Sequence, residues 1–142
     1  MTFTKRQIRT GNDRLLYLAQ FLRTLPRKKF NYDNWVGWDW EGKPDLSCGT
    51  SACALGWATT LPRFRRLGLR LNEKSFAVVN VKTGIKRSIS VAMDTFFLTE
   101  EEANYLFIPQ DGEQYVFPKY VAEKFENFVN MNMRKTGVPS DE

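Results

Sequence analysis

The stretch SCGTSACALGWA, residues 47–58, holds the side chains whose types and spacing could do chemistry. A cysteine at a helix N-terminus has a lowered thiol pKa and can act as a nucleophile. Cysteine nucleophiles work with an adjacent base, most often histidine, and the chain contains no histidine. The same absence excludes serine–histidine catalysis and histidine-containing zinc sites. We therefore expect a protein that is not an enzyme, with no catalytic residue, no metal site and no cofactor.

Backbone N–H groups give a second interpretation of this stretch. If a helix spans 48–61, then Ser47, Gly49 and Thr50 lie at its positive end, where a phosphate or carboxylate group can dock. Three arginines follow just after this helix and would add positive charge. Alternatively, Asp45 caps the helix and leaves no place for a ligand.

Close helix packing is the third interpretation. Gly49, Ala52 or Cys53, and Gly56 recur every three to four residues. One face of the helix would then allow another backbone to approach closely. Packing alone would explain both glycines and both cysteines.

Three tryptophans lie within six residues, immediately before this stretch. Aromatic rings beside basic residues can stack on nucleobases; the alternative is that these rings anchor their loop to the core. With the helix N-terminus and the arginines, they define a predicted ligand site. It consists of Trp35, Trp38, Trp40, Ser47, Gly49, Thr50, Arg63, Arg65 and Arg66.

Charge is distributed unevenly along the 142 residues. Residues 1–87 hold 17 basic against 6 acidic residues, whereas residues 88–142 hold 4 against 10. Such asymmetry indicates an anionic partner for the first part, or two charged faces that meet each other or a second copy. A solvated basic surface is the alternative.

Apolar periodicity places the first helices. Asn12 or Asp13 is expected to cap a helix with leucines at 15, 18, 22 and 25, which Pro26 ends. A helix over 48–61 follows, and Pro62 begins a short helix closed by Gly68. The β-branched run 76–81 and the turn KTG predict a small hairpin.

The last third of the chain returns to helix. Thr99 and Glu102 form a capping box, flanked by Leu98 and Ala103 as a hydrophobic staple. Pro118 suits the first turn of a last helix that carries Val121, Phe125 and Phe128 on one face. These elements predict a mainly α fold with a small β-hairpin (α+β), a single compact domain, 1–142, of about five to six short helices. Residues 136–142 are expected to form a flexible tail.

Two segments resemble a group of small proteins from bacteria and tailed phages that have no assigned activity. The segments are CGTSACALGWATTLPRFRRLGL and AMDTFFLTEEEANYLF, and LRTLPRKKF matches the Leu-Pro helix end with which members often begin. Members carry a Cys-Gly-Thr-x-x-Cys-x-x-Gly-Trp/His-Ala segment and then a Phe-x-Leu-Thr-x-x-Glu-Ala-x-x-Leu-Phe segment. The resemblance spans most of residues 13–130. It implies a phage-type protein that binds a host protein or sequesters a host defence signal.

No apolar run approaches the roughly 20 residues of a membrane helix, and MTFTKRQIRT lacks the apolar region of a secretory signal. We expect a cytoplasmic binding protein, in the host cytoplasm if phage-encoded, for an anionic, nucleotide-like ligand. One alternative is a protein–protein interaction module that engages a host protein. The other is a nucleic-acid-binding accessory protein; generic nucleic acid is not an expected partner because the last third is acidic.

Overall fold

A computed structural model describes residues 2–25, 37–38, 44–45, 51–72, 77–108 and 118–131. Helices dominate these residues, and the strands form two small antiparallel pairs. The predicted fold class, mainly α with a small β-hairpin, is confirmed. In chain order the elements are α1 (Lys5–Leu22), β1 (Gly37–Trp38), β2 (Pro44–Asp45), α2 (Ser51–Ala58), α3 (Pro62–Leu67), β3 (Leu69–Leu71), β4 (Val78–Asn80), α4 (Ser88–Phe96), α5 (Glu100–Phe107) and α6 (Pro118–Asn130).

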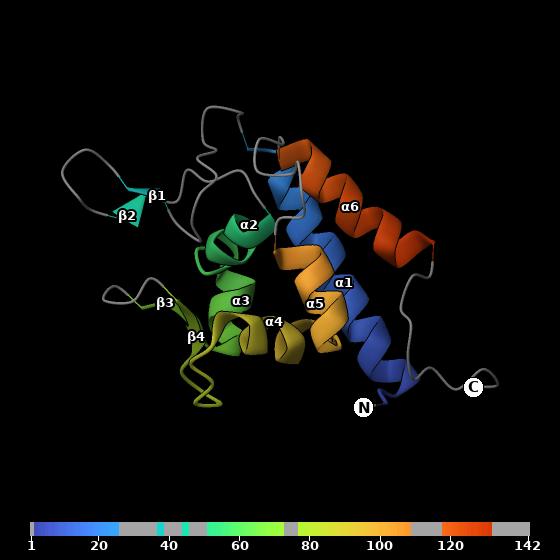
Figure 1. Ribbon diagram of the computed structural model, residues 1–142, viewed down its shortest axis with the longest axis horizontal. Coiled ribbons are helices and arrows are strands. Elements are labelled where there is room, and N and C mark those ends of the chain that lie inside the picture. The colour runs from blue at the N-terminus through green and yellow to red at the C-terminus, as the bar shows by residue number, and fades with distance from the viewer. Residues whose placement is uncertain are drawn as a thin grey trace.

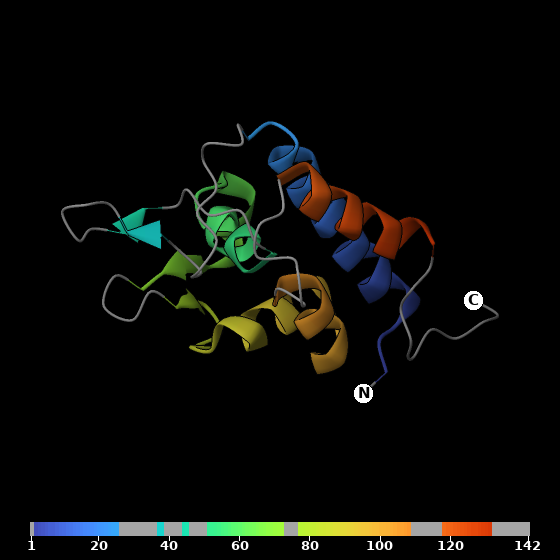
Figure 2. The same cartoon turned by 45° about the horizontal axis from the view of Figure 1, so that its top comes forward.

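The long helices α1 and α6 form one side of the molecule. They lie side by side and run in opposite directions (Figures 1 and 2), and α1 packs more extensively against α6 than against any other element. Helices α4 and α2 also contact α1, and α5 packs against both α4 and α2. The pair β3–β4 lies beside α3 and α4.

A chain of aromatic rings runs through the core and joins five helices. Tyr17 of α1 contacts Phe64 of α3 at 5.8 Å between ring centroids, and Phe64 contacts Phe96 of α4 at 5.6 Å. Phe96 stacks on Phe107 of α5 at 5.2 Å, and Phe107 contacts Phe125 of α6 at 5.1 Å. All four phenylalanines are fully buried. Each ring pair adds to the stability that burial provides.

Helix α1 begins earlier than the sequence predicted. Its N-cap is Thr4, which forms a capping box with Gln7, so the expected cap at Asn12 or Asp13 is wrong. The box satisfies two backbone N–H groups, those of Thr4 and Gln7, that the helix itself leaves free. Gly11 does not interrupt the helix, because it lies on the buried stripe with Ile8 and Leu15. The helix ends at Leu22 rather than at the proline that follows Leu25.

Most of the other predicted helix ends are confirmed. Pro62 begins α3, and Gly68 ends it with a left-handed φ of +106°. Thr99 accepts a hydrogen bond from the Glu102 N–H, and the Glu102 carboxylate accepts one from the Thr99 N–H. Pro118 begins α6, whose Val121, Phe125 and Phe128 are buried as expected. Helix α2 is shorter at its C-terminal end than predicted, because residues 59–61 form a turn before Pro62.

The hairpin differs from the prediction in its pairing. Strand β4 pairs with the preceding β3, with Leu69 opposite Asn80 and Leu71 opposite Val78, and the turn KTG follows β4. The side-chain oxygen of Asn80 accepts hydrogen bonds from the N–H groups of Lys82 and Thr83, which fixes this turn. The residues beyond the turn then enter α4 at Ser88 instead of forming a strand.

Strands β1 and β2 pair antiparallel in a segment for which the sequence analysis predicted no strand. Among the described residues, no helix has both the length and the apolar character needed to span a membrane. The predicted single domain, 1–142, stays a prediction, and the predicted tail lies outside the described residues.

Candidate functional site

The predicted ligand site falls largely outside the part of the chain that the structure describes. Trp38 contributes its backbone to β1, and its side chain is not among those described. The arginines Arg63, Arg65 and Arg66 lie on α3 and are exposed. The residues outside the described ranges are Trp35, Trp40, Ser47, Gly49 and Thr50.

The described second half of SCGTSACALGWA is packed into the core. Ala54, Leu55 and Ala58 have at most 1% of their surface exposed, and Gly56 is buried beside them. The half-buried ring of Trp57 contacts Phe21 of α1 at 5.9 Å. Residues 54–56 and 58 are therefore buried, whereas the close approach of another backbone predicted at Gly49, Ala52 or Cys53, and Gly56 stays a prediction.

The three arginines of α3 make different contacts. The Arg63 guanidinium lies 4.7 Å from the ring centroid of Tyr17 on α1. Arg65 donates a hydrogen bond of 3.1 Å to the carbonyl of Thr59, at the turn before the helix. The carbonyl of Arg66 accepts a 2.5 Å hydrogen bond from Lys82. Of these contacts, the one made by Arg63 reaches α1.

A fourth arginine, Arg14 of α1, lies near Arg63. It is half-buried, and its Nη1 donates a 2.8 Å hydrogen bond to the carbonyl of Thr95. Its guanidinium also lies 5.8 Å from the ring centroid of Phe97. Sequence reasoning missed Arg14 because it placed this residue in the first turn of a helix. The longer α1 places Arg14 beside the buried stripe, one turn before Leu18. This spacing from Leu18 was the signal in the sequence that Arg14 would be partly buried.

The two guanidinium groups repel each other. Burial lowers the pKa of Arg14, the positive charge of Arg63 lowers it further, and the carboxylate of Asp94 acts in the opposite direction. Both groups are oriented mainly by neutral partners, the Thr95 carbonyl and the aromatic rings. A pair of fixed, mutually repelling guanidinium groups favours an anion between them, since a phosphate or carboxylate can accept hydrogen bonds from both.

Backbone strain occurs at the same place. Phe97 has a φ of +52°, a left-handed conformation that bulky residues rarely adopt. It ends α4, where its N–H donates to the carbonyl of Met93, and its ring contacts the edge of Phe3 at 6.0 Å. Strained residues persist where their surroundings hold them, and they concentrate at functional sites. Phe97 therefore marks the surroundings of Arg14.

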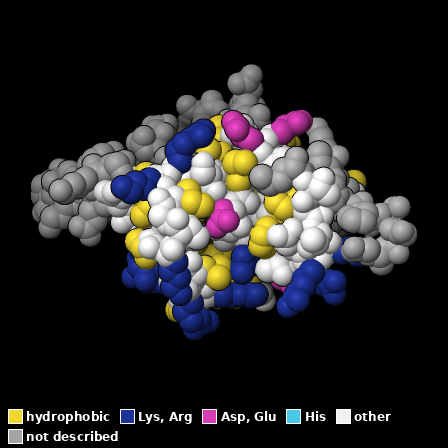
Figure 3. All heavy atoms as spheres, turned by 90° about the horizontal axis from the view of Figure 1, so that it is seen from below, with side chains coloured by type: hydrophobic (Ala, Val, Ile, Leu, Met, Phe, Trp, Pro, Cys, Tyr) yellow, Lys and Arg dark blue, Asp and Glu magenta, His cyan; other side chains and the backbone are white. Residues whose placement is uncertain are grey.

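Further basic residues lie on β3 and around the turn after β4. Arg70, on β3, is half-buried, whereas Lys82, Lys86 and Arg87, around the turn after β4, are exposed. The face seen in Figure 3 carries many more basic than acidic side chains. Such a charge distribution raises the local concentration of anions around this face.

Within the described ranges, no three carboxylate or thiol side chains gather closely enough to hold a metal ion. The described residues that converge are thus two arginines, three aromatic rings and one carboxylate. In comparisons of the whole chain, no protein-family model, no curated protein and no solved structure matches it.

Proposed function

We propose that this protein binds an anionic, nucleotide-like ligand without transforming it, and that Arg14 and Arg63 hold the phosphate group of that ligand. One observation supports the proposal. Burial lowers the pKa of Arg14 most, and the two guanidinium groups are close enough for the charge of Arg63 to lower it further, against the opposing effect of the Asp94 carboxylate. The Thr95 carbonyl contacts the Arg14 guanidinium, and the Tyr17 ring contacts that of Arg63. A bound phosphate would replace this repulsion by two attractive contacts.

The proposal keeps the sequence-predicted tryptophans as the surface on which a base stacks, with Ser47, Gly49 and Thr50 as further phosphate contacts. It revises the role of the α3 arginines. Arg63 is the direct contact, whereas Arg65 is engaged by the carbonyl of Thr59. A protein of this kind would sequester its ligand, as a small phage-type protein in the host cytoplasm could do with a defence signal.

Isothermal titration calorimetry with AMP, a cyclic dinucleotide and inorganic phosphate tests the proposal. Arg63→Gln should weaken nucleotide binding by about 10- to 150-fold, which corresponds to about 1.5–3 kcal/mol for hydrogen bonds to a charged group. Arg87→Gln is the matched control, since Arg87 is an exposed residue outside the pair. It should change the affinity less than about twofold.

Stability measurements separate binding from structure. Arg63→Gln removes the contact with Tyr17, worth about 0.5–1 kcal/mol at an exposed site, and also removes the repulsion on Arg14. The free energy of unfolding should therefore change by less than about 1 kcal/mol. Unchanged nucleotide affinity in Arg63→Gln, or no binding of any of the three probes by the parent protein, would refute the proposal.

Salt dependence distinguishes this ligand from nucleic acid. A protein that neutralises several DNA phosphates loses affinity with a log–log slope of about −0.9 for each phosphate. A site with two arginines should show a shallow slope and keep its affinity at about 0.15 M salt. Submicromolar binding of random duplex or single strands at that salt would favour the nucleic-acid alternative.

A further inference from the structure

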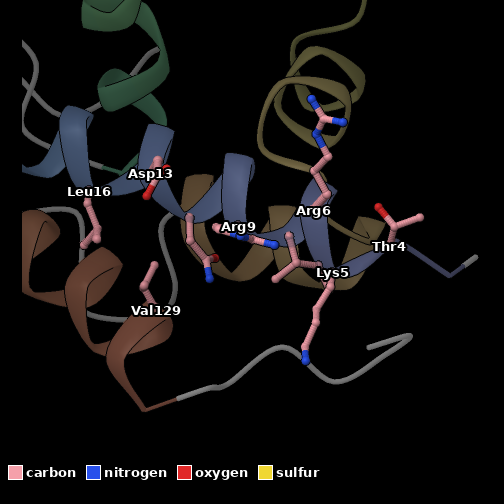
Figure 4. A pocket seen from close by; sticks show the side chains of 9 residues that line it. Thr4, Lys5, Arg6, Arg9, Asp13, Leu16 and Val129 are labelled. Atoms are coloured by element: carbon pink, nitrogen blue, oxygen red, sulfur yellow. The ribbon is translucent and has the colours of Figure 1, made fainter. Parts of the chain in front are cut away.

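Helix α6 covers one flank of α1, but its C-terminal end stops short of the N-terminus of α1. Near the C-terminal end of α1, Arg23 forms a bidentate ion pair with Glu126, at 2.8 Å and 2.5 Å. Farther along the same flank, Leu16 of α1 and Val129 of α6 face each other (Figure 4). Helix α6 ends at Asn130, one residue later, and the flank of α1 continues toward its N-terminus as one wall of an open groove of about 860 Å³.

The groove combines an apolar end with a cationic end. Leu16 and Val129 line one end, Asn12 and Asp13 follow, and Ile8, which is 7% exposed, lines the groove farther toward the other end. Lys5 and Arg9 line the cationic end (Figure 4). Neither cation forms a hydrogen bond or an ion pair with the described part of the chain.

We propose that this groove is the docking site for an acidic, amphipathic helix of a partner protein, which would lie end to end with α6 against α1. From Leu16 to Thr4, α1 rises about 18 Å at 1.5 Å per residue. A partner helix of about 12 residues, three turns, covers this length. The existing α6–α1 contact shows that this flank packs against a helix, and helices bind such grooves through apolar residues at i, i+3 or i+4, and i+7.

Charge fixes the direction of the partner. Its carboxylates should lie beside the apolar stripe at the end that meets Lys5 and Arg9. The opposite end meets Asp13, which also lines the groove, and should therefore be neutral or basic. A helix with an acidic end and an apolar stripe satisfies both conditions.

This groove and the Arg14–Arg63 site are independent. Lys5 and Arg14 are nine residues apart, and two and a half turns of helix place them on opposite sides of α1. Each proposal can therefore fail without the other.

The test uses the full chain and a fluorescein-labelled 16-residue helical peptide, with leucine at i, i+3, i+7 and i+10 and glutamate beside the N-terminal half of the stripe. A second peptide replaces each glutamate by lysine. Fluorescence anisotropy at about 0.15 M salt should show binding of the acidic peptide, and the lysine peptide should bind at least about tenfold more weakly.

Two double charge reversals then locate the site. Lys5→Glu/Arg9→Glu should weaken acidic-peptide binding by about tenfold or more, since two attractive contacts become repulsive. Lys86→Glu/Lys119→Glu changes the net charge equally at exposed positions outside the groove, and it should leave the affinity within about twofold. Circular dichroism of both variants should match the parent protein.

Three results would overturn the proposal: no binding of the acidic peptide by the parent, equal losses in the two double variants, or equal binding of a leucine-free poly-glutamate peptide. The last result would show attraction to charge alone. In the parent, amide NMR shifts confined to residues 5–16 and 126–131 would support it.

Discussion

Gly68→Ala is expected to destabilise the protein by about 3 kcal/mol, because two costs coincide at this residue. Gly68 ends α3 with a φ of +106°, which an L side chain adopts only with strain. A Cβ atom at this position would also lie 2.4 Å from the side-chain oxygen of Asn80 and 3.0 Å from Cγ of Lys82. Real Cβ contacts are essentially never shorter than 3.0 Å, so the Asn80 oxygen would have to move.

The Asn80 side chain cannot move freely. It is 4% exposed, its oxygen accepts hydrogen bonds from Lys82 N–H at 2.9 Å and Thr83 N–H at 3.1 Å, and its Nδ2 donates to the carbonyl of Leu67 at 3.2 Å. The left-handed backbone costs about 1–2 kcal/mol. Loss of two hydrogen bonds at about 0.5–1.5 kcal/mol each adds a similar amount.

Gly84→Ala provides the matched control. Gly84 has a φ of +81°, and a Cβ atom added there would meet no atom within 4 Å, so only the left-handed backbone cost of about 1–2 kcal/mol applies. Urea denaturation at 25 °C gives both free energies of unfolding. In an Asn80→Ala background, the additional effect of Gly68→Ala should fall toward that of Gly84→Ala. Equal destabilisation by the two glycine substitutions in the parent protein would refute the steric argument.

Three further substitutions test other parts of the fold. Thr99→Ala should lower the free energy of unfolding by about 1 kcal/mol, because it removes the hydroxyl that accepts a hydrogen bond from the Glu102 N–H. Thr99→Ser keeps a hydroxyl at this position and should retain most of that stability in thermal denaturation. The hydrogen bond from Arg23 lowers the pKa of Glu126 in the folded protein. The stabilisation by this ion pair is therefore fully present above the pKa of the unfolded chain, about 4.3, and is lost as pH falls through the pKa of the folded protein. Arg23→Ala should therefore reduce the stability difference between pH 7 and pH 3, and an unchanged difference would contradict this. Gly56→Leu should lower Tm markedly, since Gly56 is buried and overpacking costs about 1–3 kcal/mol or more; a Tm within one degree of the parent would place Gly56 at the surface.

Local signals in the sequence predicted most helix ends correctly. Thr99 with Glu102, Pro62, Gly68 and Pro118 act through backbone hydrogen bonds or fixed dihedral angles within a few residues, so a short window suffices. The start of α1 carried an equivalent signal, a threonine followed three residues later by a glutamine, that the prediction did not use.

Contacts between distant residues could not be predicted in the same way. The pairing of β3 with β4 depends on Asn80, whose side chain holds both the following turn and the carbonyl of Leu67. The approach of Arg14 to Arg63 depends on how α1 and α3 pack around Phe64. Residue type and spacing identified Arg63 as a candidate, but they contained no information about its neighbour on α1.

The packing of α1 against α6 also sets the timing of folding during synthesis. The last residue of α6 leaves the ribosome 108 residues after the last residue of α1, which takes about 5–20 s at typical translation rates. Until then, the part of the α1 surface that α6 covers in the folded protein lacks this partner. The nascent chain should therefore engage chaperones that bind apolar segments. Ribosome-bound chains that end before residue 118 should be cleaved by protease within α1 more readily than chains that include residue 130.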